Sequence, residues 1–144
     1  MLKDQESNSA TAITHVVDAS ALVAYFKGEQ GHDHVAALLM DERNNLAIHA
    51  VNLCEVYYGY LRSDGLDKAN EAWERAVKLL GVLENVSEGC EKRVARWKVK
   101  PGLGLGDSFL AASAEEHAAI LVTADHGDFD PVQQAGLIRI EFIR

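Results

Sequence analysis

The 144-residue chain lacks any long apolar run, which excludes a helical membrane span. Such a helix needs about 18 or more consecutive apolar residues, and none of that length occurs although hydrophobic residues make up 48% of the chain. The first twelve residues, MLKDQESNSATA, are polar and lack the apolar segment of a signal peptide. We therefore expect a cytoplasmic protein, with residues 1–12 as a disordered lead-in and residues 13–144 as a single domain.

Positive charge is also scarce. The chain has 14 Lys and Arg against 22 Asp and Glu, which gives a formal net charge of −8. Proteins that hold nucleic acid with their whole surface use Lys and Arg to meet the phosphates, so the charge argues against that class. It does not argue against an enzyme whose acidic site reaches a phosphate through a divalent cation.

Cysteine and histidine are too few and too scattered for a zinc site. Cys54 and Cys90 show no CxxC spacing, and we expect both to be reduced, partly buried thiols. Of the six histidines, His32 and His34 are two positions apart and would lie on different faces of a helix. A metal bound by this chain would therefore be held by oxygen ligands.

Short apolar segments alternate with helical patterns along most of the chain. The candidate strands are 13–18, 45–50, 82–86, 120–123 and 137–143. The candidate helices are 20–26, 31–42, 52–63, 67–83, 87–99 and 109–119. Strands separated by helices favour a parallel sheet that is covered on both faces. We therefore predict an α/β fold, a three-layer α/β/α domain with a central, mostly parallel sheet.

Four acids stand at or beside the ends of these elements. Asp18 ends the first strand, Asp107 follows three spaced glycines at the start of a helix, and Asp125 follows the strand ILVT. Glu55 lies near the start of the third helix. An open α/β sheet binds ligands at the carboxyl ends of its strands and the amino ends of its helices, so these acids could face one crevice.

Each acid also has a structural explanation. Asn52 and Glu55 match a capping box, in which Glu55 would only close the start of its helix. Asp107 gains about 0.3–1 kcal/mol from the dipole of a first helical turn. Asp125 and Asp128 fit ordinary loop acids in a turn that includes Gly127.

The four acids taken together favour a metal site. Two like charges 4 Å apart repel by about 1 kcal/mol in water and about 4 kcal/mol at an effective dielectric constant of 20, so converging carboxylates need a compensating cation. Oxygen ligands without a set of His or Cys select Mg²⁺ or Mn²⁺ over zinc. Beside a phosphodiester, such an ion lowers the pKa of a bound water and neutralises charge on the phosphoryl oxygens, which implies backbone hydrolysis without a nucleophilic side chain.

Three stretches carry a resemblance to a known family: VVDASALVAYF, NLCEVYYGY and GLGDSFLAASAEEHAAILVTADHGDFDPV. With these stretches in this order, the sequence from about residue 13 to residue 144 resembles the PIN-domain family, and within it the VapC-type ribonuclease toxins of bacterial toxin–antitoxin pairs. The resemblance implies a PIN-like nuclease domain with Mg²⁺- or Mn²⁺-dependent endoribonuclease activity on RNA. It also implies a homodimer and inhibition by a small cognate antitoxin protein.

The resemblance assigns roles to individual residues. It implies four catalytic and metal-binding acids: Asp18, Glu55, Asp107 and Asp125. At the fourth acid family members vary, and Asp128 could supply or support the ligand in place of Asp125. The small hydroxyl residues Ser20 and Thr123 stand where such residues often support the acids, although a helix cap and a strand end explain them equally well.

A basic run precedes the glycine loop. It places five of the fourteen basic residues within nine positions: Lys92, Arg93, Arg96, Lys98 and Lys100. The last four are our candidates for contacts with RNA phosphates. A solvated helix face is the alternative, because Glu88 and Glu91 are interleaved with them.

Other functions of acid-rich α/β domains fit less well. A phosphoacceptor receiver domain needs a late lysine, and none follows Lys100. A haloacid-dehalogenase-like phosphatase needs an Asp where this chain has Ser20. The remaining alternative is a catalytically silent PIN-fold module that binds protein or RNA.

Overall fold

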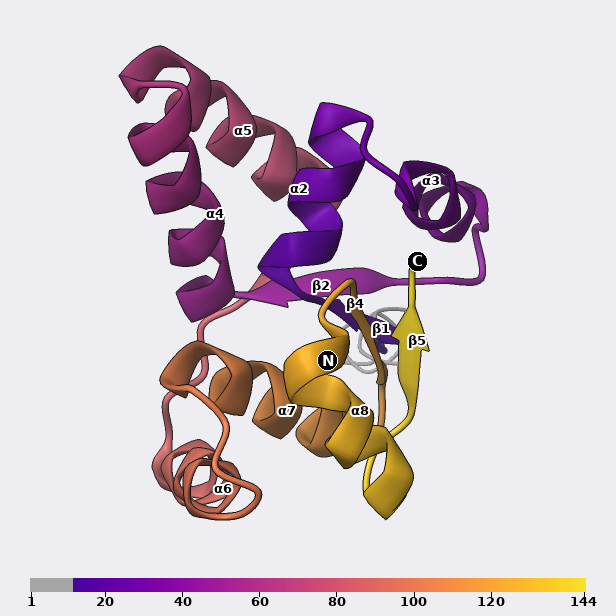
Figure 1. The fold of residues 1–144 in the computed structure, drawn as a ribbon, viewed down its shortest axis with the longest axis vertical. Helices are drawn as coiled ribbons and strands as arrows, with labels where there is room; N and C mark the ends of the chain where they lie inside the picture. Colours follow the sequence, from indigo (N-terminus) through magenta and orange to yellow (C-terminus); the bar gives the residue numbers. More distant parts are fainter. Residues whose placement is uncertain (1–11) are drawn as a thin grey trace, which may run out of the picture.

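The computed structural model describes residues 12–144, which form a five-stranded sheet between two layers of helices (Figure 1). Disorder was expected for residues 1–12, of which residues 1–11 lie outside the described residues. The strands are β1 (His15–Val17), β2 (Leu46–His49), β3 (Gly81–Leu83), β4 (Ile120–Thr123) and β5 (Ile140–Phe142). The helices are α2 (Ala19–Lys27), α3 (His32–Met40), α4 (Ala50–Ser63), α5 (Leu66–Leu79), α6 (Glu88–Val99), α7 (Leu105–His117) and α8 (His126–Ala135). Within residues 12–144, no helix combines the length and the apolar character that crossing a bilayer requires.

The strands lie in the order β3-β2-β1-β4-β5, and every neighbouring pair is parallel. The predicted α/β class and parallel sheet are confirmed. β2 and β3 lie on one side of β1, and β4 and β5 lie on its other side. The order therefore reverses between β1 and β4. In open α/β sheets, ligands bind outside the carboxyl ends of the strands at this reversal.

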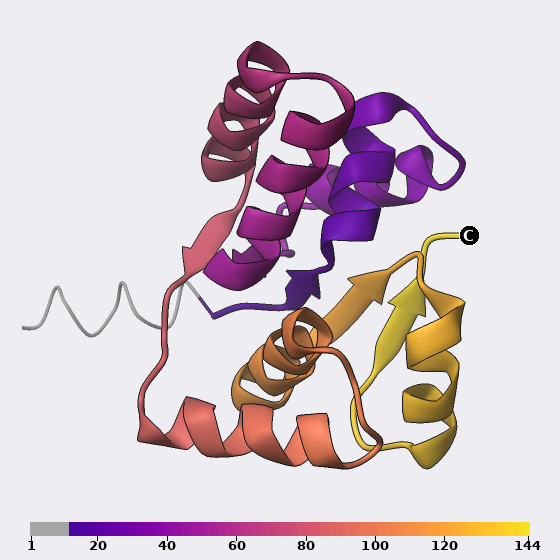
Figure 2. The ribbon, with the colours of Figure 1, turned by 60° about the vertical axis from the view of Figure 1, so that its left-hand side comes forward.

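The core consists of two apolar clusters, one on each face of the sheet. Successive strand residues point to opposite faces, so Val17 and Val122 join one cluster while Val16 and Leu121 join the other. Helices α2, α3, α4 and α5 cover the first face, and α7, α8 and the outer helix α6 cover the second (Figure 2). The predicted three-layer arrangement is confirmed.

Helix α4 begins two residues before its expected start, and this changes the interpretation of Asn52. Its N-cap is His49, the last residue of β2, whose ring nitrogen Nδ1 accepts a hydrogen bond from the Val51 N–H at 3.1 Å. Asn52 is thus a residue of the first turn and not a cap. The predicted capping box of Asn52 and Glu55 is wrong, because the Asn52 side chain donates to Glu55 and to the Gly106 carbonyl and does not cap the helix.

Helix α8 was not predicted from the sequence, which indicated a turn around Gly127; the helix also contains Pro131. The structure places both residues inside the helix. Asp125 caps it by accepting a hydrogen bond from the Asp128 N–H at 3.2 Å. The cap keeps both acids at the amino end of α8, where the helix dipole contributes about 0.3–1 kcal/mol per negative charge.

Candidate metal centre

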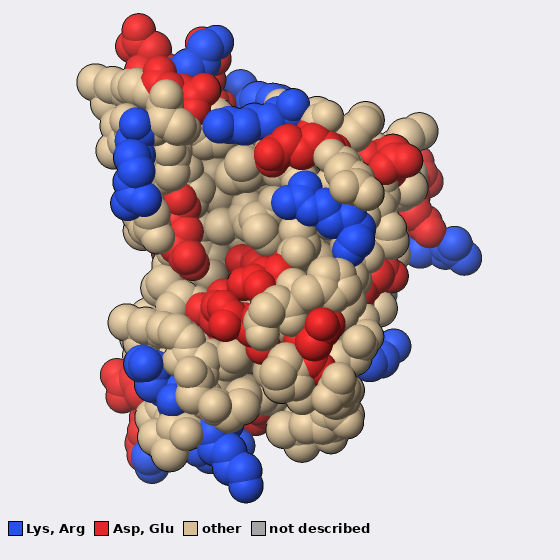
Figure 3. All heavy atoms as spheres, in the orientation of Figure 1, with Lys and Arg blue, Asp and Glu red and all other residues tan. Residues whose placement is uncertain are grey.

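Acidic side chains converge at the carboxyl edge of the sheet, where the strand order reverses. Asp18 directly follows β1 and Asp125 follows the end of β4, while Asp107 lies in the first turn of α7 and Glu55 in α4. On the face shown in Figure 3, Asp and Glu gather in a hollow between α2 and α4 on one side and α7 and α8 on the other. The hollow is thus lined by elements that are far apart in the sequence.

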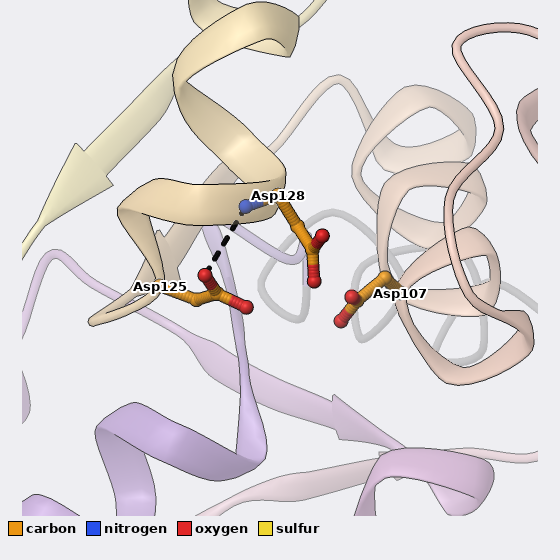
Figure 4. A group of neighbouring side chains, drawn as sticks. All are labelled: Asp107, Asp125 and Asp128. Atoms are coloured by element: carbon orange, nitrogen blue, oxygen red, sulfur yellow. Dashed lines mark hydrogen bonds between the residues drawn. The ribbon is translucent and has the colours of Figure 1, made fainter.

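Three aspartates form the centre of this group. One carboxylate oxygen from each of Asp107, Asp125 and Asp128 lies within 4.8 Å of the other two. Asp107 from α7 and Asp128 from α8 point toward one another, and Asp125 stands beside them at the start of α8 (Figure 4). From the sequence, Asp128 could supply or support the metal ligand in place of Asp125. In the structure both Asp125 and Asp128 lie close to Asp107.

Asp18 is a buried acid beside this cluster, and it accepts hydrogen bonds from two hydroxyl groups. Only 5% of Asp18 is exposed, and its Oδ2 accepts hydrogen bonds from Thr123 Oγ1 at 2.7 Å and Ser20 Oγ at 2.8 Å. The same hydroxyls accept from the backbone: Thr123 from the Asp125 N–H at 3.0 Å and Ser20 from the Ala124 N–H at 3.1 Å. Burial raises the pKa of Asp18, although the hydroxyl donors oppose this shift. Through these hydrogen bonds, Ser20 and Thr123 connect Asp18 to the backbone of Ala124 and Asp125.

Glu55, on α4, packs against Gly106 beside the cluster and is half-buried. Neither Glu55 nor Asp18 belongs to the three acids whose oxygens lie within 4.8 Å of one another. The Glu55 carboxylate packs so closely on Gly106 that a Cβ at that position would overlap it. Asn52 Nδ2 donates to Glu55 Oε1 at 2.8 Å and also to the Gly106 carbonyl at 3.0 Å. Burial raises the pKa of Glu55, the Asn52 donor opposes that shift, and the negative charge of Asp18 adds to it. The sequence did not single out Asn52 or Gly106 as site residues.

Asp107 has the most perturbed acidity of the group. Burial, a hydrogen bond with Asp128 and the negative charges of Asp18, Asp128 and Glu55 together raise the pKa of Asp107 to about 8. In the metal-free protein, this raised pKa favours a protonated Asp107 at neutral pH. A cation at this position would take over the role of the proton in reducing the repulsion.

The donor atoms fit a hard divalent cation. The described residues of the three-aspartate cluster offer carboxylate oxygens only, with no sulfur or imidazole ligand. Mg²⁺ takes octahedral oxygen ligands at about 2.0–2.1 Å and keeps several waters, so three side chains can hold it. His126 follows Asp125 but is turned away, because its ring nitrogens bind Asp130 Oδ1 and the Arg144 carbonyl, each at 2.8 Å. The cluster thus suits Mg²⁺ or Mn²⁺ better than zinc.

The predicted RNA contacts of α6 lie on the outer side of α7 (Figure 2). Arg93 and Arg96 both pair with Glu115 of α7, at 3.6 Å and 3.1 Å, so their charge is partly balanced within the protein. Lys98 and Lys100 are exposed at the end of α6. Contact of these four residues with RNA stays a prediction.

A second group of cations, not singled out from the sequence, lies between α2, α4 and α5. Lys27, Lys68 and Arg75 line a pocket of about 310 Å³ with aromatic walls. The guanidinium of Arg75 lies 4.3 Å from the centre of the Phe26 ring, and Lys27 lies 4.8 Å from that of Tyr60. Lys27 ends the helix that Asp18 begins, about 14 Å along its axis. The pocket therefore lies at the far end of the helix that starts in the acidic hollow.

Comparison with known proteins gives the family. The model of the PIN domain family matches residues 15–133. No curated protein sequence matches the chain. The matched residues include all five acids described above.

Solved structures share the fold. DNA-bound VapBC from Salmonella typhimurium has a TM-score of 0.71 at 17% identity, and the match covers 92% of this chain and 99% of that one. The Pyrobaculum aerophilum protein PAE2754 has a TM-score of 0.68 at 24% identity, with coverage of 93% and 92%. The Mycobacterium tuberculosis toxin VapC20, described as cleaving the sarcin-ricin loop, has a TM-score of 0.66 at 16% identity, with coverage of 82% and 95%. At these identities the likeness extends to the fold.

Proposed function

The chain belongs to the PIN domain family, and from this membership and its acidic cluster we propose that it is a Mg²⁺- or Mn²⁺-dependent endoribonuclease, the VapC-type toxin of a toxin–antitoxin pair. The observation that supports this most is the convergence of Asp107, Asp125 and Asp128 at the reversal of the strand order. Like charges at this spacing destabilise the empty fold unless a cation or a proton lies between them. The proposal also places the protein in the cytoplasm, where RNA is accessible.

In the proposed mechanism Asp107, Asp125 and Asp128 would hold the metal. Asp18 and Glu55, also expected as ligands, lie outside this closest group and would support it. A bound divalent cation lowers the pKa of a coordinated water and neutralises charge on the phosphoryl oxygens. Ser20 and Thr123 keep Asp18 oriented, because each donates to the same oxygen, Oδ2. Glu55 would accept a proton from the water that attacks the phosphate, a role that its raised pKa favours, and the leaving oxygen would take a proton from solvent.

The RNA strand must meet cations outside the acidic hollow. We propose contacts with Arg93, Arg96, Lys98 and Lys100 of α6 on one side. On the other side, Lys27 and Arg75 offer charge next to aromatic rings, an arrangement typical of sites that take phosphates and bases of single strands. These cations explain how a chain of net charge −8 would still bind RNA.

The proposed partners are a small antitoxin and a second copy of the chain. Several structural neighbours are toxin–antitoxin complexes, among them one from Klebsiella pneumoniae. An apolar groove of about 700 Å³ between α4, α5 and β3 offers a surface for a partner. Its wall includes Tyr58, 48% exposed, and Trp73, 45% exposed, and aromatic side chains of this kind are enriched in interfaces.

The test of this function is incubation of the purified protein with total cellular RNA, with Mg²⁺, Mn²⁺ or EDTA, followed by mapping of the cleaved ends. We expect discrete cuts that need the metal and that disappear in Asp107→Asn. Cleavage that persists in EDTA or in Asp107→Asn would refute the mechanism. If the wild type neither cuts RNA nor responds to metal, the chain is instead the catalytically silent PIN-fold module.

A further inference from the structure

Asn52 is a buried amide between two of the proposed active-site acids. It is fully buried in the first turn of α4, and its Nδ2 makes both of its hydrogen bonds outside the apolar core. One bond goes to Glu55 Oε1 at 2.8 Å, one turn along the same helix, and the other to the Gly106 carbonyl at 3.0 Å. Gly106 directly precedes Asp107 in the first turn of α7. One side chain therefore connects Glu55 to the backbone that carries Asp107.

The orientation of this amide is fixed by its neighbours. Both groups that face Nδ2 are acceptors, a carboxylate oxygen and a carbonyl, so an amide turned the other way would set oxygen against oxygen. In the observed orientation both hydrogens of Nδ2 are used, and the Asn52 Oδ1 is left buried with no hydrogen-bond partner among the described residues. An unpaired buried acceptor destabilises a fold. If only the stability of the fold mattered, an apolar residue would be favoured at position 52. The Asn52 amide donor therefore indicates a role in the arrangement of the acidic site.

Gly106 completes the arrangement. The Glu55 carboxylate lies so close to Gly106 that a Cβ at position 106 would force the carboxylate to move. Glu55 is thus held on one side by the glycine backbone and on the other by the Asn52 amide, which occupies Oε1. Among residues 12–144, none donates a hydrogen bond to Glu55 Oε2. The second carboxylate oxygen is therefore free of protein hydrogen-bond donors among these residues.

We propose that Asn52 is a positioning residue of the nuclease site, which fixes Glu55 relative to Asp107 and leaves Oε2 of Glu55 for the cation or its water. This inference rests on the function proposed above. Asn52 itself touches neither metal nor substrate in this scheme. Partners that orient metal-site ligands in this way usually change metal affinity or activity by about 10–100-fold when they are removed.

The test is a double-mutant cycle with Asn52→Leu and Glu55→Ala. Leucine has a similar volume without the donor, so we expect the metal-free thermal midpoint of Asn52→Leu to equal or exceed that of the wild type. We expect its Mn²⁺ affinity, measured by titration, and its kcat to fall by about 10–100-fold, with KM for RNA unchanged. Once Glu55 is replaced by alanine, Asn52→Leu should cause no further loss, because there is no carboxylate left to position.

The control is Asn70→Leu, which removes another amide that makes a side-chain hydrogen bond, here with the Tyr57 hydroxyl on the neighbouring helix. It should leave Mn²⁺ affinity and kcat unchanged. An equal loss from Asn52→Leu in the presence and absence of Glu55, or no loss at all, would overturn the role of Asn52 while leaving the nuclease intact. A wild type that binds Mn²⁺ but cuts no RNA would overturn the proposed function alone, and a wild type that binds no Mn²⁺ would overturn both.

Discussion

Replacing Asp107 by asparagine should stabilise the metal-free protein at alkaline pH. The pKa of Asp107 is raised to about 8 in the folded chain, whereas an unfolded chain loses this proton near pH 4. Between these values the folded state binds more protons than the unfolded state. Stability from this group is therefore complete below about pH 4 and is lost as the pH rises to about 8. An asparagine side chain does not titrate, so the advantage of Asp107→Asn should grow over this range.

The size of the effect follows from the spacing of the carboxylates. Two charges 4.8 Å apart, the limit set by the aspartate cluster, repel by about 0.9 kcal/mol in water and about 3.5 kcal/mol at an effective dielectric constant of 20. The cluster is partly open to solvent, which screens the interaction, so we expect a gain of roughly 1–3 kcal/mol at pH 8. For 144 residues the entropy of unfolding is about 0.3 kcal/mol/K, which converts this gain into about 3–10 °C in Tm.

Differential scanning calorimetry in EDTA at pH 5 and pH 8 measures this directly. The Tm difference between the two proteins should be small at pH 5 and clearly larger at pH 8. Glu74→Gln is the matched control, because it removes one negative charge from an exposed position on α5, and it should not change the difference between the two pH values. Equal Tm values for Asp107→Asn and the wild type at pH 8 would refute the reasoning, as would the same gain at both pH values.

Three further changes test other parts of the site and the core. Thr123→Val removes a donor from buried Asp18 and an acceptor from the Asp125 N–H, so urea denaturation should show a loss of about 1–3 kcal/mol. Gly106→Ala should weaken Mn²⁺ binding by about tenfold or more, because the new Cβ displaces the Glu55 carboxylate. Its control is Gly59→Ala, where a Cβ meets nothing within 4 Å. This change should add about 0.5–1 kcal/mol to the free energy of unfolding and leave Mn²⁺ binding unchanged. A disulfide reagent should modify exposed Cys54 in the native protein. It should modify Cys90 only after unfolding, because Cys90 is buried and burial raises the pKa of its thiol. Fast reaction of both thiols in the native protein would contradict the packing of α6.

The sequence predicted those parts of the site that depend on local pattern. Asp18 and Asp125 were expected at strand ends, and Asp107 in a first helical turn, because apolar runs and glycines mark these boundaries. The structure has each of them there. In a parallel sheet the carboxyl ends of all strands meet at one edge, so their convergence follows from the topology.

Features that depend on contacts between distant segments could not be predicted. The pattern around Asn52 fits a cap, and only the approach of α7 shows that its amide binds Gly106 instead. Likewise, the basic face of α6 gave no sign that Glu115 of α7 would pair with Arg93. Helix α8 was missed for a different reason, since Pro131 disfavours a helix locally while Phe129 and Val132 bury themselves completely against the core. Tertiary burial outweighed the local preference.

The acids of the hollow are stabilised in two different ways, and the difference bears on metal binding. Asp18 and Glu55 are each held by side-chain donors, so their positions are set before any cation arrives. Asp107 instead has a pKa raised to about 8, so a cation bound there would displace its proton. Metal binding should therefore release a proton and strengthen as the pH rises toward 8. Side-chain donors thus hold Asp18 and Glu55 without metal, whereas the proton that a metal would displace lies on Asp107.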